Sequence, residues 1–127
     1  MTKKKLFEIE FIIRSSPHIL YEFVSTPSGL SQWFADNVDA IQNKFKFIWG
    51  NTAQIADMVE NVENERVRFR WQGAPKEEYF QFKIQISEIS NDTVLIVTDF
   101  ANPKEIKDQT RLWDSQIKSL TEHIGAG

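Results

Sequence analysis

Hydrophobic and polar residues alternate along the first segment of the chain, residues 6–14. The apolar positions of one face are Phe7, Ile9, Phe11 and Ile13. A period of two is typical of a strand with one buried face. We therefore expect a strand here whose apolar side contributes to a core.

The period changes to that of a helix over residues 15–26. Ser16 can act as the N-cap, and Pro17 suits the first helical position. The apolar residues of this segment, which share one helical face, are Ile19, Leu20, Phe23 and Val24. Pro27 is expected to end the helix.

A second short helix is expected directly after Pro27, with Ser28 as its start. Leu30, Trp33 and Phe34 lie at positions i, i+3 and i+4. This spacing predicts that they project from one side of a helix of about two turns. Asp36 and Asn37 would close it.

The residues from 37 to 100 are mostly strand-like. Alternating segments occur at 44–50, in the two arms of a hairpin within 53–71, and at 79–89. The run TVLIVTDF at 93–100 is almost continuously apolar, which favours a central strand covered on both faces or a strand bordering an interface. This run leaves open which face Asp99 takes.

A long helix is expected at the end of the chain. Asn102 can cap it, Pro103 suits its first position, and Glu105 can complete a capping box. One stripe, with spacings of four and three, comprises Ile106, Thr110, Trp113, Ile117, Leu120 and Ile124. Gly125 is expected to end the helix.

The order of these elements predicts an α+β fold: one strand, two short helices, about five strands and a long helix. The last helix would cover the apolar face of an antiparallel sheet. The two short helices would close one end of the space between this sheet and the last helix, and the side chains of Trp33 and Phe34 would fill that end.

Composition narrows the classes of function. The 127 residues, 41% hydrophobic and 26% charged, predict one globular domain over 1–127. No apolar run is long enough to span a membrane, and the segment MTKKKLFEIEF has no secretion-signal pattern, so we expect a cytoplasmic protein. The absence of cysteine excludes disulfides, thiolate metal sites and cysteine nucleophiles. The net charge of −3 counts against nucleic-acid binding.

Four segments carry a resemblance to a known family: LSQWFAD at 30–36, MVENVENERVRFRW at 58–71, NDTVLIVTDF at 91–100 and LWDSQIKSL at 112–120. In this order they resemble the START-like (SRPBCC) superfamily, closest to the bacterial homologues of Aha-type chaperone activators. The resemblance implies the helix-grip fold, a curved antiparallel sheet wrapped around the last helix, with a cavity of variable content. Members include lipid and sterol carriers, polyketide cyclases, hormone receptors and chaperone cofactors, so the resemblance leaves the function open.

The titratable residues give little support to catalysis or metal binding. His18 and His123 lie near helix ends, where we expect them to face solvent. An acidic group around the hairpin comprises Asp57, Glu60, Glu63 and Glu65, and its spacing matches no calcium loop. Cross-strand pairing with Arg66, Arg68 and Arg70 is favoured, and a partner-binding stripe of arginines is the alternative. No metal and no cofactor are expected.

The aromatic residues are more informative. Ten phenylalanines and four tryptophans predict either a densely packed core or an amphipathic pocket, because a buried indole N–H requires a partner. The residues predicted to line such a pocket are Trp33, Phe34, Phe47, Trp49, Phe69, Trp71, Phe82, Asp99, Thr110, Trp113, Gln116 and Ile117.

Three functions remain compatible with the sequence. The favoured one is non-catalytic binding of a small hydrophobic or amphipathic ligand between sheet and last helix. The second is a protein-interaction module, either similar to a chaperone cofactor or homodimeric through the outer face of the last strand. The third, a cyclase-type enzyme, has the least support because no histidine or cysteine is predicted to face the pocket.

Overall fold

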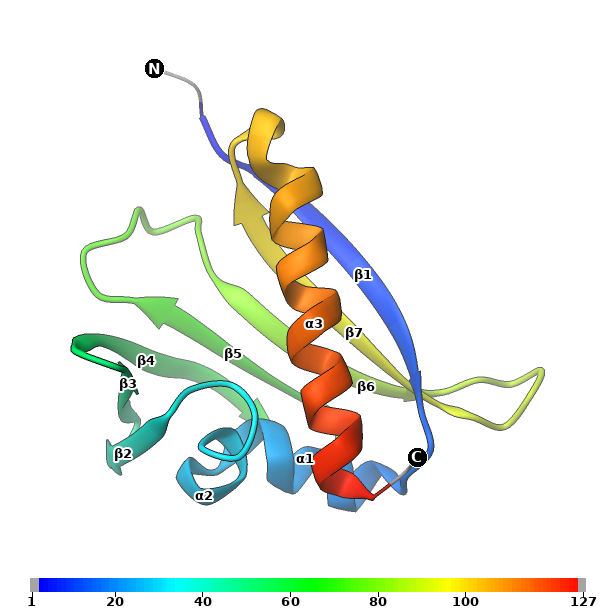
Figure 1. Cartoon of the computed structure of the whole chain (residues 1–127). Helices are drawn as coiled ribbons and strands as arrows, with labels where there is room; N and C mark the ends of the chain where they lie inside the picture. Colours follow the sequence, from blue (N-terminus) through cyan, green and yellow to red (C-terminus); the bar gives the residue numbers. More distant parts are fainter. Residues whose placement is uncertain (1–2, 126–127) are drawn as a thin grey trace.

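A seven-stranded antiparallel sheet curves around one long helix in the computed structural model, which describes residues 3–125 (Figure 1). Its strands are β1 (Lys5–Ile13), β2 (Asn37–Ile41), β3 (Lys44–Trp49), β4 (Thr52–Val62), β5 (Arg66–Trp71), β6 (Phe80–Ile86) and β7 (Thr93–Ala101). They are ordered β1-β7-β6-β5-β4-β3-β2 across the sheet. The predicted α+β helix-grip architecture is confirmed.

The helices all lie on the concave side or at one end of the sheet (Figure 1). They are α1 (Pro17–Ser25), α2 (Pro27–Leu30), the 3-10 turn η1 (Pro103–Glu105) and α3 (Ile106–Ile124). From the predicted stripe of α3, Trp113, Ile117 and Leu120 are buried against the sheet. Gly125 ends α3 with a φ of 77°, a left-handed conformation that glycine adopts without strain.

The second short helix is smaller than predicted. Thr26, and not Ser28, caps it: the Thr26 hydroxyl accepts a hydrogen bond from the Gly29 N–H at 3.0 Å. The helix ends at Leu30, whose carbonyl accepts hydrogen bonds from the next turn, including Phe34 N–H at 2.9 Å. Trp33 and Phe34 therefore lie on a turn and not on a two-turn helix. The chain leaves this turn to enter the sheet.

Two further local predictions differ from the structure. The edge strand β2 was not expected, because only Val38 and Ala40 alternate as apolar residues within it. At the start of α3, Asn102 makes no side-chain cap to the backbone. Its amide instead donates to the Glu105 carboxylate at 2.8 Å, and a 3-10 turn precedes the helix. The capping box is therefore wrong, although the helix begins nearly where expected.

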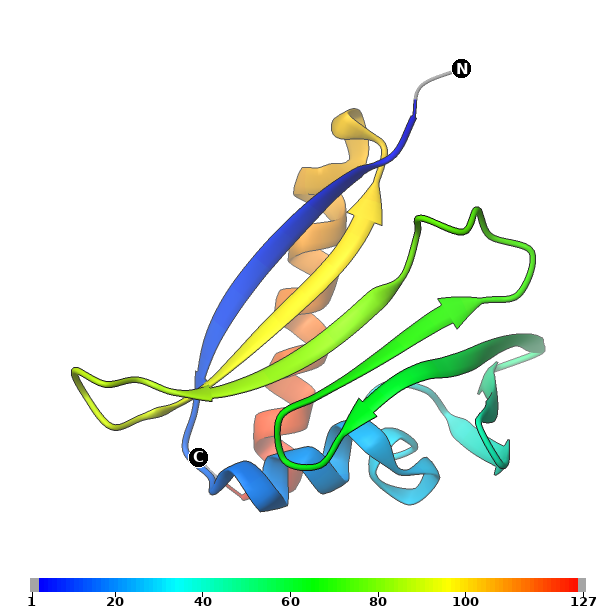
Figure 2. The ribbon, with the colours of Figure 1, turned by 180° about the vertical axis from the view of Figure 1, so that it is seen from behind.

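The sheet has one covered and one uncovered face. An irregularity in β4 between Met58 and Glu60 interrupts its register with β5, and such bulges bend strands. No helix of the described residues covers the convex face (Figure 2). In β7, Leu95 and Val97 are buried on the concave side and Ile96 is only half-buried on the other. The alternative of a strand covered on both faces is therefore wrong.

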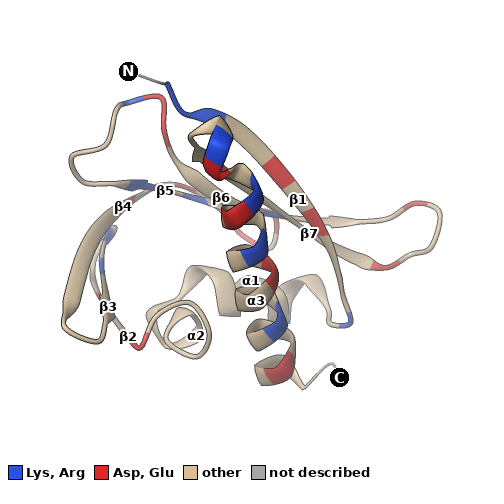
Figure 3. Ribbon diagram, turned by 45° about the horizontal axis from the view of Figure 1, so that its top comes forward, with Lys and Arg blue, Asp and Glu red and all other residues tan. Residues whose placement is uncertain are grey.

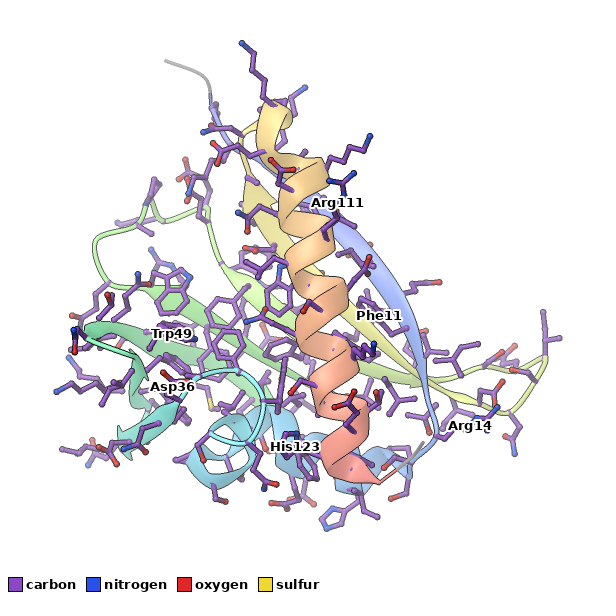
Figure 4. The ribbon with its side chains drawn as sticks, viewed as in Figure 1. Phe11, Arg14, Asp36, Trp49, Arg111 and His123 are labelled. Atoms are coloured by element: carbon purple, nitrogen blue, oxygen red, sulfur yellow. The ribbon has the colours of Figure 1, made fainter. Side chains whose placement is uncertain are left out.

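Charged residues lie mainly outside the space between sheet and helix. Basic and acidic residues follow one another along α3, and basic residues gather at the start of β1 (Figure 3). Arg111 on α3 points away from the sheet (Figure 4). No helix within residues 3–125 has the length and apolar character needed to cross a membrane.

Candidate functional site

Phe34 lies at the centre of an aromatic cluster beneath α3. Its ring is 5.2 Å from Phe47 of the sheet, 5.6 Å from Phe80 and 5.9 Å from Trp113 of α3, measured between ring centroids. The neighbouring Trp33 is 7% exposed, and its indole N–H donates to the Phe23 carbonyl of α1 at 2.8 Å. The turn after α2 thus joins the sheet, α3 and α1, and it closes one end of the space between them.

A cleft of about 330 Å³ opens beside this cluster, between α3 and the strands β3 to β7. It is lined by Phe34, Trp49, Gln54, Trp71, Phe80, Asp99, Gln109, Leu112, Trp113 and Gln116. Trp49 lies at the end of β3, to one side of α3 (Figure 4). Six of the ten lining residues are aromatic or leucine, and the polar ones are amides and a single carboxyl group. The cleft has the mixed lining typical of small-molecule sites.

A smaller hollow of about 210 Å³ adjoins this cleft. The two share Trp71, Asp99 and Gln109. The hollow extends toward Lys4 and Glu78 at the ends of β1 and β6, and toward Glu105 at the start of α3. Asp99 therefore lies where the two spaces meet.

Asp99 faces inward from β7, because it shares the side of Leu95 and Val97 in a strand of period two. Its Oδ2 accepts the indole N–H of Trp113 at 3.0 Å, and its Oδ1 accepts the Phe100 N–H at 2.8 Å. Burial raises the pKa of the Asp99 carboxyl above its ordinary value, and the Trp113 hydrogen bond opposes that shift. An ionisable group is thus held at the inner wall of the cleft.

Three of the four indole N–H groups have partners within the protein. Those of Trp33 and Trp113 are described above, and that of Trp49 donates to the Phe34 carbonyl at 2.9 Å. The Trp71 N–H has no hydrogen-bond partner among residues 3–125. Because Trp71 lines both the cleft and the hollow, its indole can bind a ligand there.

The structure places six of the twelve predicted pocket residues in the cleft lining, five in the core and one, Thr110, in neither. Those that line the cleft are Phe34, Trp49, Trp71, Asp99, Trp113 and Gln116. The buried residues that pack in the core away from the cleft are Trp33, Phe47, Phe69, Phe82 and Ile117. The twelfth, Thr110, donates its hydroxyl hydrogen bond to the Ile106 carbonyl within α3, at 2.8 Å.

Four lining residues were missed by the sequence analysis: Gln54, Phe80, Gln109 and Leu112. Phe80 alternates with Phe82 in the same strand, so it was open to prediction. Gln109 precedes Gln116 by seven residues, which places both on one side of a helix. Gln54 and Leu112 carry no pattern that separates them from surface residues.

The histidines and the acidic group lie outside the cleft. His18 and His123 are exposed, as expected, and contact Asn64 Oδ1 and the Ser119 carbonyl. Glu60 pairs with Arg66 and Arg68 across β4 and β5, which lowers the pKa of Glu60 and agrees with the predicted cross-strand pairing. In the part of the chain that the structure describes, no three His, Cys, Asp or Glu side chains could together hold a metal ion.

Solved structures share this architecture. BfR322 from Bacteroides fragilis is 34% identical, with a TM-score of 0.69 over 97% of this chain and 92% of the other. The Aha1 dimer from Colwellia psychrerythraea is 18% identical, with a TM-score of 0.77 over 94% and 96%. DynU16, from the dynemicin biosynthetic locus, is 17% identical with a TM-score of 0.77; the match covers 96% of this chain but 48% of DynU16. At their low identity, the latter two show the fold alone.

The family model for the START-like superfamily domain matches residues 1–126. No curated protein matches the chain significantly. The matched region includes every element that forms the sheet, α3 and the cleft between them. The chain therefore belongs to the START-like superfamily.

Proposed function

We propose that the cleft between α3 and the sheet binds a small hydrophobic or amphipathic molecule without chemically altering it. The observation that carries this proposal is the cleft of about 330 Å³, which adjoins a fully packed aromatic cluster but is not filled by it. Its volume lies at the lower end of the range of roughly 300–1,000 Å³ found for small-molecule pockets. The proposed location of this activity is the cytoplasm.

The lining supports binding more than catalysis. Trp49, Trp71 and Phe80 offer large apolar surfaces, and burial of apolar area is the main source of affinity for such ligands. Among the described residues that line the cleft, Asp99 is the one titratable group. Acid–base catalysis by a pair of groups would need a second titratable group, and these residues supply none. Orientation of a bound molecule needs only a few polar contacts.

A cleft-blocking variant tests this proposal. Leu112 lies at the mouth of the cleft and is 51% exposed, so Leu112→Trp adds bulk there without disturbing the core. We expect the neutral probe N-phenylnaphthylamine to bind the unmodified protein saturably, with a fluorescence increase. Leu112→Trp should weaken that binding about tenfold, because the added ring occupies the ligand's space.

The matched control is Ile12→Trp, which adds the same ring on the convex face, where Ile12 is 66% exposed. It should leave the affinity for the probe unchanged. Equal affinities of Leu112→Trp and Ile12→Trp would contradict binding in the cleft, and so would the absence of saturable binding by the unmodified protein.

The second candidate function is protein interaction through the convex face of β1 and β7. Leu6 and Ile12 are exposed there, and their partners in register, Phe100 and Val94, are only half-buried. Glu8 and Glu10 lie between Leu6 and Ile12 on this face of β1. Exposed apolar residues of this kind, interspersed with charged ones, favour an interface, homodimeric or with a chaperone partner. Light scattering tests it: a dimer that Ile12→Glu converts to a monomer would support this function, and a monomeric unmodified protein would contradict the homodimer.

A further inference from the structure

The described residues that line the cleft include several polar groups but no cation. Gln54, Gln109 and Gln116 contribute amides, Trp71 contributes an N–H, and Asp99 contributes a carboxyl group. Neither lysine, arginine nor histidine is among the described residues that line it. An anionic headgroup in this cleft would lose its hydration without gaining an opposite charge, which is unfavourable.

The adjoining hollow is also richer in carboxyl groups than in cations. Its carboxyl groups are those of Asp99, Glu78 and Glu105, and Lys4 is its single cation among the described residues. The Lys4 Nζ is 3.7 Å from the Glu78 carboxylate. Its charge opposes the rise in the Asp99 pKa, but Lys4 makes no salt bridge to Asp99. Glu105 lies in the first turn of the helical segment, where it offsets the partial positive charge of the helix start.

Asp99 retains capacity to accept hydrogen bonds. A carboxylate offers about four acceptor positions on its two oxygens. Within residues 3–125, Asp99 accepts from only the Trp113 indole and the Phe100 backbone, which are both neutral donors. No salt bridge to Asp99 forms in this part of the chain. Trp71 lines both spaces together with Asp99, and indole rings attract cations.

We infer that the polar end of the ligand is a protonated amine held by Asp99, and that the cleft selects against carboxylate and phosphate headgroups. The inference rests on the proposed function, since it specifies the ligand class of the same cleft. The ligand's apolar part lies against Trp49, Phe80 and Leu112, and its ammonium group lies at the junction with the hollow. There the ammonium group supplies the charged donor that Asp99 lacks.

A series of three probes with one naphthalene ring separates the headgroups: naphthylmethylamine, naphthylmethanol and naphthoic acid. Isothermal titration at neutral pH measures the affinity of each. We expect the amine to bind about tenfold more tightly than the alcohol, because a hydrogen bond between charged partners is the stronger one. The acid should bind more weakly than the alcohol.

Asp99→Asn tests the residue itself, because the amide keeps the shape of the side chain and removes its charge. The tenfold preference for the amine over the alcohol should disappear in this variant. The matched control is Glu10→Gln, which removes the same charge from an exposed position on β1 outside the cleft lining. Glu10→Gln should keep the preference.

The outcomes separate the two proposals. If the acid binds the unmodified protein as tightly as the amine, the amine inference is overturned and ligand binding stands. The same holds if Asp99→Asn and Glu10→Gln have equal effects. If none of the three probes binds saturably, ligand binding in the cleft is itself contradicted. The comparison of headgroups on the unmodified protein remains decisive even if Asp99→Asn fails to fold.

Discussion

The space beneath α3 is filled at one end and hollow at the other. At the filled end, beside α1 and α2, Leu20, Leu30 and Leu120 have no exposed surface, and Trp33 is hydrogen-bonded to α1. At the hollow end, Asp99 and Gln109 interrupt the apolar wall, and two adjoining spaces remain open. Both ends are rich in aromatic residues. A further open hollow of about 480 Å³ lies beside the turn that carries Trp33 and Phe34, and it too has polar lining residues such as Gln32 and Gln116. Polar lining residues, and not aromatic content, are therefore what the open spaces share and the closed interior lacks.

The comparison predicts that stability depends mainly on the filled end and its boundary. Phe34→Ala should lower the free energy of unfolding by about 3–5 kcal/mol, because a 5% exposed ring in contact with several others leaves a cavity. Urea unfolding measures this loss. Leu112→Ala at the mouth of the cleft is the control and should change stability by about 0.5 kcal/mol. Equal losses of stability in Phe34→Ala and Leu112→Ala would contradict the distinction between a packed end and an open end.

The close approach of α2 to α1 gives the next largest effect. A methyl group on Gly29 would overlap the Glu22 carbonyl oxygen and lie 2.6 Å from the Phe23 Cα, both of which are backbone atoms that cannot move independently. Gly29→Ala should therefore cost about 1–3 kcal/mol of stability in urea unfolding. Ser28→Ala, one residue earlier in the same short helix, is the control. A Gly29→Ala protein as stable as Ser28→Ala would show that the two helices are not packed as described.

A tryptophan from each end sharpens the comparison. Trp33→Phe and Trp113→Phe both delete an indole N–H, leaving the Phe23 carbonyl and the Asp99 carboxyl respectively without that donor. Each should cost about 1–3 kcal/mol. Only the loss of stability in Trp113→Phe should depend on pH, because the acceptor that it leaves without a donor, the Asp99 carboxyl group, is ionisable. Unfolding measured across a pH series would contradict this account if the two losses varied with pH in the same way.

Asp99 predicts the smallest effect, a change in how stability depends on pH. Its folded-state pKa is raised by burial above the ordinary value of 3.8, so the folded protein binds that proton more tightly than the unfolded chain. Stability from this group is present below the ordinary value and is lost as pH rises through the folded pKa. Asp99→Asn lacks this loss.

The measurable quantity is the difference in unfolding free energy between Asp99→Asn and the unmodified protein. As the pH rises above 3.8, the unmodified protein should lose stability relative to Asp99→Asn, so this difference should shift toward the variant. The lowered pKa of Glu60 is present in both proteins and cancels in this difference. A difference that is constant with pH would show that burial does not raise the Asp99 pKa.

Most of the fold was predictable because its long elements have clear periods. The alternation in β1 and the stripe of α3 each extend over many residues, so the pattern outweighs local exceptions. The two-turn helix expected after Pro27 was wrong for a tertiary reason. Asp36 donates its N–H to the Ile48 carbonyl at 2.9 Å and accepts from the Gly50 N–H at 2.7 Å, which draws the chain into the sheet.

The candidate site was only partly predictable. Phe80 and Phe82 face the same side of β6, yet Phe80 lines the cleft and Phe82 lies in the core. Which of the two lines the cleft depends on where each lies relative to α3 and on the curvature of the sheet. The alternation of the sequence gives the face of a residue but not this position. Asp99 could be nominated from its residue type, but its inward face became evident only from the register of β7 with β1, where it lies opposite Phe7.

The most direct test of ligand binding at the hollow end uses the four indole N–H signals in a proton–nitrogen NMR titration with N-phenylnaphthylamine. Trp71 lines the cleft and its N–H has no partner among residues 3–125, whereas the Trp33 N–H is bonded at the filled end. We predict a saturable shift of the Trp71 signal while the Trp33 signal stays in place. A Trp71 signal that does not move, or equal shifts of both signals, would contradict the account.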